Sequence, residues 1–327
     1  MRKLFIGEND KDQRLDKFMQ KTFKSMPRSM VYKYIRKKCV RINGFHASAD
    51  SVLALGDELS FYISDEYFGK GEAEFLDLRP SFGVVYEDEN ILIVDKPAGL
   101  LCQPDGREKR NTLDNHIKSY LYSKGEYSPD NENSFSPALC NRIDKNTQGL
   151  VISAKNADSL RIMNEKIKKR EIEKYYLCLV YGKPSFEKKI LHDYLIKDYN
   201  NNSVRISSVP AKGYKEIKTE YEVLATDNNI SLLRVRLLTG RTHQIRAHMA
   251  YIGHPLLGDG KYGKKDKKIP FMYQALSSCE LFFDFKTDAG ALSYLDGKRF
   301  KTEPFFAKYD IVTNLLKIQK TKKTREK

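Results

Sequence analysis

The sequence predicts an α+β protein in two domains, and three observations support this prediction. The 327 residues suit two domains of ordinary size. An acidic, irregular stretch at 65–80 separates a short first unit from a longer second one, as a linker would. In both units, segments with helical periodicity are mixed with short apolar runs that are typical of strands. We therefore expect a first domain at 13–64, a linker at 65–80, a second domain at 81–310 and a basic tail at 311–327.

The composition indicates a folded protein with an anionic partner. Hydrophobic residues make up 40% of the chain and aromatic residues 11%, which allows a sizeable core. The net charge of +15 favours a polyanion, either nucleic acid or an acidic membrane surface. No apolar run reaches the length of a membrane span and Met1–Gln13 is too polar for a signal peptide, so a cytoplasmic location is expected. Five cysteines without C-x-x-C spacing argue against a disulfide framework and a zinc ribbon.

The first unit is predicted to contain two helices followed by short strands. One helix begins at Arg14, and a second begins after Pro27 with Ser29 as its N-cap. Six basic residues and no acidic one lie between positions 28 and 41. They are Arg28, Lys33, Arg36, Lys37, Lys38 and Arg41. Such a surface is either an ordinary solvated face or a phosphate-binding one, and the lack of acidic residues favours phosphate.

In the second unit, the run 91–94 predicts a strand that is buried on both faces. Helices are expected at 113–122 and 157–170, a strand at 173–182 and an antiparallel meander at 190–222. Lys96 follows the first of these strands. It lies either in a simple strand-ending turn or at the mouth of a site.

The run Cys140–Leu150 is the first candidate site. Asp144 stands between two cations, Arg142 and Lys145, where an irregular segment meets a predicted strand. A carboxylate beside opposite charge stays ionised, and it can serve as a nucleophile or an electrostatic stabiliser. The alternative is an acid that caps a turn and pairs with its neighbours.

The second candidate site is the run Ser231–Met249, in which a strand leads through a Thr-Gly turn into a helix. Arg241, His243 and Arg246 cluster at the predicted helix start, where an anion would be stabilised. A metal site is not expected, because His243 and His248 are five residues apart and would point to different faces of the helix.

Four segments of the first unit resemble the alpha-L RNA-binding domain shared with a small-subunit ribosomal protein. They are Arg14-Leu15-Asp16-Lys17-Phe18, Arg28-Ser29, Val40-Arg41-Ile42-Asn43-Gly44 and Gly56-Asp57-Glu58. The resemblance implies that the second helix and the Asn43-Gly44 turn lie against structured RNA.

Four segments of the second unit resemble the RluA-type pseudouridine synthases, with an arrangement closest to the RluC-like enzymes. They are Asp95-Lys96-Pro97-Ala98-Gly99, Arg142-Ile143-Asp144 with Thr147 and Gly149, Lys174-x-Tyr176 with Gly182, and the run Leu238–His248. The implied fold is a mixed, mainly antiparallel β-sheet with flanking helices. The implied activity is isomerisation of uridine to pseudouridine in RNA, most of all in large-subunit ribosomal RNA.

The resemblance also implies roles for individual residues. Asp144 would be the nucleophile, Arg246 would pair with it, Tyr176 would lie against the flipped uracil, and Arg142 would contact the RNA as the base leaves. The expected RNA-binding residues are Arg14, Lys17, Arg28, Ser29, Lys33, Arg36, Lys37, Lys38, Arg41, Asn43, Lys96, Arg241 and His243. Neither a metal nor a cofactor is needed, no membrane is involved, and a monomer is expected.

Two positions depart from the family pattern, which has His at Asn141 and Ser at Gln148. We expect the bulkier Gln148 to narrow the RNA path. Two alternatives remain open on the sequence. One is a non-catalytic rRNA-binding or ribosome-assembly factor that retains the fold. The other is a metal-dependent nuclease that uses Asp144 with His243 and His248.

Overall fold

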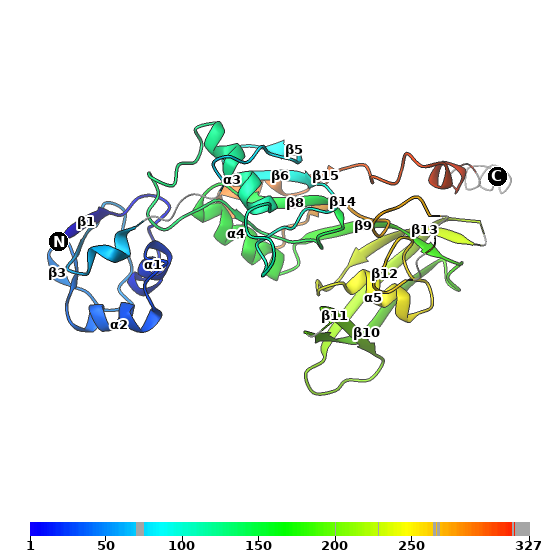
Figure 1. Ribbon diagram of the computed structural model, residues 1–327, viewed down its shortest axis with the longest axis horizontal. Helices are drawn as coiled ribbons and strands as arrows, with labels where there is room; N and C mark the ends of the chain where they lie inside the picture. Colours follow the sequence, from blue (N-terminus) through cyan, green and yellow to red (C-terminus); the bar gives the residue numbers. More distant parts are fainter. Residues whose placement is uncertain are drawn as a thin grey trace.

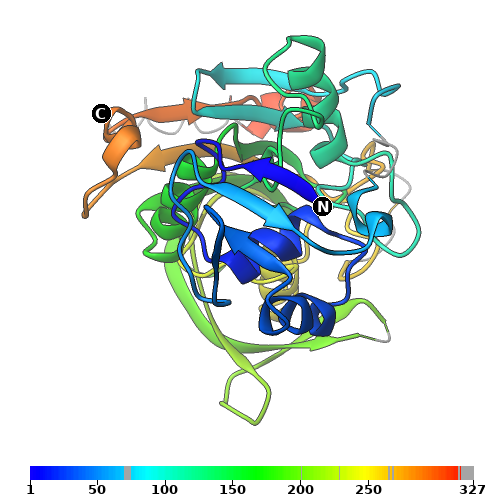
Figure 2. The ribbon, with the colours of Figure 1, turned by 90° about the vertical axis from the view of Figure 1, so that its left-hand side faces the viewer.

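The computed structural model describes residues 1–69, 75–199, 201–227, 229–263, 266, 269–315 and 317. The N-terminal unit lies at one end of the elongated molecule and the sheet of the larger domain extends away from it (Figure 1). Figure 2, which faces the N-terminal unit, shows the long green to yellow-green strands curving around behind it. Residues 318–327 of the predicted basic tail are outside the described residues.

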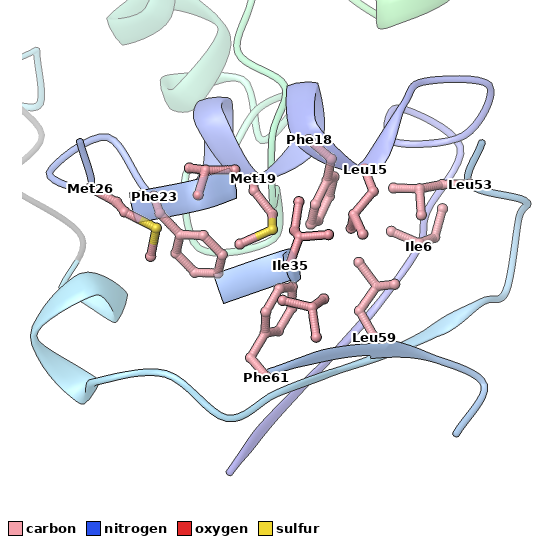
Figure 3. Close-up of a cluster of buried hydrophobic side chains, with 12 residues drawn as sticks. Ile6, Leu15, Phe18, Met19, Phe23, Met26, Ile35, Leu53, Leu59 and Phe61 are labelled. Carbon is pink, nitrogen blue, oxygen red and sulfur yellow. The ribbon is translucent and has the colours of Figure 1, made fainter. Parts of the chain in front are cut away.

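The N-terminal unit packs two helices against a four-stranded antiparallel sheet with the order β1-β4-β2-β3. Its elements are β1 (Arg2–Phe5), α1 (Leu15–Thr22), α2 (Arg28–Arg36), β2 (Val40–Ile42), β3 (Phe45–His46) and β4 (Glu58–Phe61). Leu15, Phe18 and Met19 of α1 are buried against Ile35 and Phe61 (Figure 3). Their spacing places them on one face of the helix.

Two details of this unit differ from the sequence-based expectation. The unit begins before residue 13, because β1 pairs with β4 along its whole length. The N-cap position of α2 is Pro27, and Ser29 lies inside the first turn. Proline fixes φ near the −58° found here and has no N–H of its own, and no side chain caps this helix start.

The larger domain is built on an 11-stranded sheet with the order β11-β10-β12-β13-β9-β14-β8-β6-β5, and β15 and β7 pair with β14 and β8. β14 and β8 are parallel, whereas the other pairs are antiparallel. The prediction of an α+β fold with a mixed, mainly antiparallel sheet is therefore confirmed. The elements are β5 (Gly83–Glu87), β6 (Ile91–Lys96), α3 (Leu113–Ser123), β7 (Ala138–Leu139), β8 (Gln148–Ala154), α4 (Ala157–Lys168), β9 (Ile172–Tyr181), β10 (Lys188–Asp198), β11 (Ser203–Ser207), β12 (Lys215–Thr226), β13 (Ile230–Leu237), α5 (Gln244–Tyr251), β14 (Leu276–Phe283), η2 (Gly290–Leu295) and β15 (Arg299–Lys301).

Helices cover both faces of the sheet at β6 and β8. Alternate residues of a strand point to opposite faces. Ile93 and Ile152 belong to the core on the α4 side, together with Met163. Leu92 and Val151 belong to the core on the α3 side. Burial on both faces explains why these strands are continuous apolar runs in the sequence.

The register of three strands determines how the Asp144 loop lies relative to Tyr176. Gly149 of β8 pairs with Ser278 of β14, which pairs with Tyr176 of β9. Gly149 has φ of +128°, and a Cβ there would lie 2.2 Å from the Ser278 carbonyl oxygen. Only glycine allows β8 to approach β14 this closely. The loop that carries Asp144, just before β8, is therefore held two strands from Tyr176.

The N-terminal unit and the larger domain are joined by direct polar contacts. Asp10 is 2% exposed. Its carboxylate accepts hydrogen bonds from Asn133 Nδ2 at 2.8 Å and from Ser134 Oγ at 2.6 Å. Asn9 Oδ1 accepts from the backbone N–H of Ala157, at the start of α4, at 3.0 Å. These contacts fix the orientation of the basic unit relative to the sheet.

Residues 65–69 and 75–80 of the predicted linker belong to the described part of the chain, and residues 70–74 lie outside it. The linker begins with a short 3-10 helix, η1 (Asp65–Phe68). Farther along, Phe75 is buried, and the carbonyl oxygen of Leu78 accepts a hydrogen bond from Ser119 Oγ of α3 at 2.6 Å. The linker residues Phe75 and Leu78 thus pack against α3.

Candidate active site

Asp144 lies in the loop between β7 and β8, where a tight turn presents its side chain. The Thr147 N–H donates to the Asp144 carbonyl oxygen at 3.0 Å and closes the turn. The Thr147 hydroxyl is buried and accepts a hydrogen bond from Gln274 Nε2 at 3.2 Å. The Asp144 side chain is 23% exposed. This turn therefore holds one carboxylate at the edge of the protein interior.

Arg246 of α5 links Asp144 to a second, fully buried acid. Its Nη1 donates to Asp144 Oδ2 at 3.2 Å. Its Nε and Nη2 donate to the two oxygens of Asp259 at 2.7 and 2.9 Å. Burial alone would raise the pKa of Asp259, but the guanidinium beside it holds that pKa below its usual range. The bidentate contact fixes the plane of Arg246, so that Nη1 points at Asp144.

The side chain of Gln244, rather than that of a charged residue, holds the segment before α5 in place. Gln244 Oε1 accepts hydrogen bonds from the Thr239 hydroxyl at 2.9 Å and from the Arg241 N–H at 3.0 Å. His243 occupies the N-cap position with φ of 54°. Its Nε2 lies 3.9 Å from Asp144 Oδ2. Arg241 precedes the helix and is exposed.

Several of the residues described above line a cavity of about 550 Å³. The predicted site residues that line it are Asp144, Tyr176, Arg246, Arg142, Arg241 and His243. Arg142 lies at the exposed rim, where its Nη1 donates to Gln103 Oε1 at 2.9 Å. Tyr176 is 6% exposed, and burial, with a further contribution from Asp144, raises the pKa of its phenol. The cavity thus combines an acid held by arginine with a neutral aromatic ring.

Comparison with known proteins identifies the family. Residues 90–251 match the family model described as RNA pseudouridylate synthase. A Mycoplasma capricolum protein named as an uncharacterized RNA pseudouridine synthase is 35% identical over 314 residues, which cover 91% of this chain and 96% of that protein. The chain belongs to the RNA pseudouridine synthases.

Two further comparisons agree with this assignment. The ribosomal large subunit pseudouridine synthase C of Buchnera aphidicola is 31% identical over 271 residues, which cover 80% of this chain and 81% of that protein. The solved structure of human RNA pseudouridylate synthase domain containing 4 superposes with a TM-score of 0.53, covers 73% of this chain and 93% of its own, and is 18% identical. The structural likeness shows a shared fold. The RluA-type resemblance and the isomerase activity on RNA uridine are therefore confirmed.

Lys96 of the synthase does not fit the predicted RNA-binding role. It is fully buried, and its ammonium donates to the carbonyl oxygens of Pro97 at 2.9 Å, Leu100 at 2.8 Å and Lys145 at 2.9 Å. Burial lowers the pKa of Lys96 to about 8, so all three N–H donors are present at neutral pH. The sequence showed a cation near the site but not its burial. The prediction was wrong, and Lys96 is a residue that holds the chain beside Asp144.

Gln148 likewise does not narrow the RNA path. It is buried, and its Nε2 donates to both oxygens of Asp95, at 3.0 and 2.9 Å. Its Oε1 accepts from the Ser277 hydroxyl and from the Phe305 N–H, both at 2.9 Å. The longer side chain thus joins β6 and β14 to the segment after β15. Asn141, the other departure, accepts the Ile152 N–H at 2.8 Å.

The ten expected RNA-binding residues of the N-terminal unit lie apart from the cavity. Most are exposed, and Arg28, Lys33 and Arg36 belong to α2. Arg14 is held by Asp16, with Nε–Oδ1 at 3.1 Å. Asn43 lies in the β2–β3 turn, and its Oδ1 accepts a hydrogen bond from the Glu58 N–H at 2.9 Å. Apart from Lys96, the expected RNA-binding residues therefore fall into two groups, this surface and the two cavity residues Arg241 and His243.

Two residues that hold the site were missed on the sequence, Asp259 and Tyr262. Asp259 pairs with Arg246, and the Tyr262 hydroxyl lies 2.9 Å from His243 Nδ1. Both belong to the glycine-rich segment 253–263, which lies outside every motif used to predict the site. The available signal was an acid flanked by Gly258 and Gly260, shortly after a helix with an inward-facing arginine.

Proposed function

We propose that this synthase isomerises one or more uridines of large-subunit ribosomal RNA, with Asp144 as the catalytic nucleophile. The observation that carries the proposal is the contact between Asp144 and Arg246 inside a cavity that Tyr176 also lines. The choice of RNA rests on similarity to the Buchnera protein named as a large-subunit enzyme and on the basic surface of α2.

In the proposed reaction, the Asp144 carboxylate attacks C1′ of the sugar and forms a C1′–O bond as the N1–C1′ bond breaks and the bonding electrons leave with the uracil. The uracil turns, C5 attacks C1′ and displaces the carboxylate, the C5 proton is lost and N1 gains a proton, so that Asp144 is regenerated and substrate and product have the same composition. Arg246 holds the carboxylate in place through its Nη1 contact and directs it into the cavity, which covalent catalysis by an acid requires.

The target uridine must leave its stack before it can enter the cavity, which costs a few kcal/mol in a duplex. We assign Tyr176 to stack on the flipped base, an interaction worth ~1–3 kcal/mol. Because burial and Asp144 raise its pKa, the phenol keeps its proton, and we prefer stacking to proton transfer. Arg142, at the exposed rim, would contact the RNA as the base moves.

The N-terminal unit would bind the surrounding RNA through phosphates, which set position rather than sequence. We propose that the exposed cations of α2 and the Asn43-Gly44 turn face the RNA, that the enzyme acts as a monomer, and that it works in the cytoplasm where ribosomes are assembled. None of the helices in the described residues is both long and apolar enough to span a bilayer. Replacing Lys33 and Arg36 with glutamine should weaken RNA binding and reduce its salt dependence.

The decisive experiment compares the wild type with Asp144→Asn on ribosomal RNA transcripts. We expect pseudouridine from the wild type and none from the variant, at equal RNA affinity. Mapping pseudouridines in cells with and without the gene would identify the position. If the wild type modifies no ribosomal RNA and Asp144→Asn restores growth of a deletion strain equally well, the protein is an assembly factor instead. The nuclease alternative has lost its support, because His248 is directed away from Asp144, to Asp193 and Thr219.

A further inference from the structure

One loop of the synthase supports both side chains that face Asp144. The loop contains Asp259, which holds Arg246, and Tyr262, which contacts His243. The first contact explains the direction of the arginine. The second has no part in the chemistry proposed above, although the His243 ring stands between Tyr262 and the catalytic acid.

The hydrogen bonds of Tyr262 favour one tautomer of His243. The Val204 N–H donates to the Tyr262 hydroxyl oxygen at 2.9 Å. His243 Nδ1 lies 2.9 Å from the same oxygen. Among the described residues, His243 Nδ1 is the acceptor within reach of the phenolic proton, because the Val204 N–H can only donate. Donation from the phenol to Nδ1 requires a neutral ring that carries its proton on Nε2.

The surroundings favour this neutral form. Burial lowers the pKa of His243, and the nearby cations Arg246 and Lys261 add to this effect against the opposing charges of Asp144 and Asp259. Burial raises the pKa of Tyr262 to about 12, so the phenol retains the proton that it donates. The result is an N–H group on the side of the ring that faces the cavity.

The backbone of His243 supports the same placement. Its φ of 54° is in the left-handed region, which a residue other than glycine adopts only when its surroundings hold it there. The ring packs edge to face on Tyr262, with centroids 5.6 Å apart. Only 11% of the side chain is exposed. The imidazole is thus held from both the main chain and the neighbouring ring.

The two oxygens of Asp144 are consequently unequal. Arg246 Nη1, at 3.2 Å, and His243 Nε2, at 3.9 Å, both approach Oδ2. No hydrogen bond to Oδ1 is found within the described part of the chain. A distance of 3.9 Å is too long for a hydrogen bond, but catalytic contacts often shorten when substrate fills a site.

We propose that His243 is a positioning residue, held by Tyr262 with its proton on Nε2, that directs Asp144 Oδ2 away from the substrate and leaves Oδ1 as the reacting oxygen. This proposal rests on the function proposed for Asp144. It also gives a role to the β10–β11 hairpin, since Val204 lies in β11. Lys261, beside Tyr262, donates to the carbonyl oxygen of Asn202 in the hairpin turn at 2.6 Å, and Asn202 lines the cavity.

The first test is the ¹⁵N NMR spectrum of the histidine rings in the free enzyme. The chain has six histidines, and His243→Gln identifies the signals of interest. We expect a bare Nδ1 and a protonated Nε2 at neutral pH, and a mixture of tautomers in Tyr262→Phe. A wild-type ring with its proton on Nδ1 would overturn the proposal. This measurement needs no activity, so it remains valid if Asp144→Asn disproves the proposed function.

The second test is the single-turnover rate on ribosomal RNA. Tyr262→Phe should lower the rate about 10-fold at unchanged RNA affinity, since it removes one hydroxyl and leaves the ring in place. His243→Gln, whose amide can still donate toward Oδ2, should retain more activity than His243→Leu. Tyr251→Phe on the exposed end of α5 and His192→Gln on β10 are matched controls. A wild-type rate in Tyr262→Phe, or equal rates in the two His243 variants, would contradict the positioning role.

Discussion

Two carboxylates of this synthase, the buried Glu171 and the partly buried Asp144, are paired with cations, yet their surroundings differ. Glu171 is 4% exposed and uses both oxygens: Oε2 accepts from Lys166 Nζ at 2.8 Å and from the Lys286 N–H at 3.1 Å, and Oε1 accepts from the Thr287 hydroxyl at 2.8 Å. The contacts of Asp144 all reach one oxygen, on the side of Arg246 and His243. Both oxygens of a structural acid accept hydrogen bonds from the protein. An acid that reacts with a substrate must leave one oxygen without such a bond.

The largest effect on folding is expected from Glu171→Gln. The change leaves Lys166, which is 1% exposed, without its counter-charge, and breaking a buried pair in this way costs about 3–5 kcal/mol. Urea denaturation measures the loss. The single-turnover rate of the folded fraction should equal that of the wild type, because neither Lys166 nor Glu171 is among the residues that line the cavity. A slower folded enzyme would contradict the distinction between the two acids.

The pH dependence of stability sharpens the same prediction. Burial alone would raise the pKa of Glu171, but Lys166 and Thr287 lower it to about 2. A folded-state pKa below the unfolded one means that the stabilisation is present above about pH 4.5 and is lost as pH falls toward 2. Thermal unfolding of Glu171→Gln should therefore depend less on pH over that range than unfolding of the wild type. If the unfolding temperature of Glu171→Gln falls with pH as steeply as that of the wild type, other carboxylates determine the loss of stability in acid.

Asp259→Asn should have the next largest effect, on the rate rather than on folding. Asparagine keeps the shape of the side chain but offers one acceptor oxygen instead of two, so Arg246 loses its fixed plane. Misplacing a catalytic group by about 1 Å can cost about 100-fold, and we expect a loss of that order in single-turnover rate. RNA affinity should not change. If stability falls as far as in Glu171→Gln while the rate is kept, Asp259 is a structural acid.

The sequence identified the residues that line the cavity better than the residues that hold them in place. Asp144, Tyr176 and Arg246 lie in runs whose spacing is tied to the chemistry, so a motif was enough to place them. Asp259 and Tyr262 act through a loop whose path depends on the whole fold, and their partners are distant in sequence. Lys96 shows the opposite error: its charge is visible in the sequence, but its burial among carbonyl oxygens is not. Helices and buried strands followed from periodicity, whereas β1 was missed because only four residues form it.

Lys96→Met tests the corrected role of that residue. Its ammonium supports the carbonyl oxygens of Leu100 and Lys145, and leaving such groups without donors costs about 2 kcal/mol. We expect that loss in urea denaturation, with RNA affinity unchanged. Lys33→Gln on the exposed face of α2 is the contrasting variant, which should weaken RNA binding and leave stability intact. Weaker RNA binding in Lys96→Met would restore the original prediction.

The smallest effect is expected from Glu165→Gln, the same substitution on the neighbouring helix α4. The Glu165–Lys169 pair is shorter than the Glu171–Lys166 pair, 2.5 Å against 2.8 Å. Both of its side chains are about half exposed, however, at 53% and 43%. Water screens the attraction and each side chain loses freedom in forming the contact, so exposed pairs contribute little. The urea midpoint should be indistinguishable from the wild type. If Glu165→Gln instead destabilised the protein as much as Glu171→Gln, the distance between the charges and not their burial would decide the strength of these pairs. The contrast between Glu171 as a structural acid and Asp144 as a reactive one would then lose its physical basis.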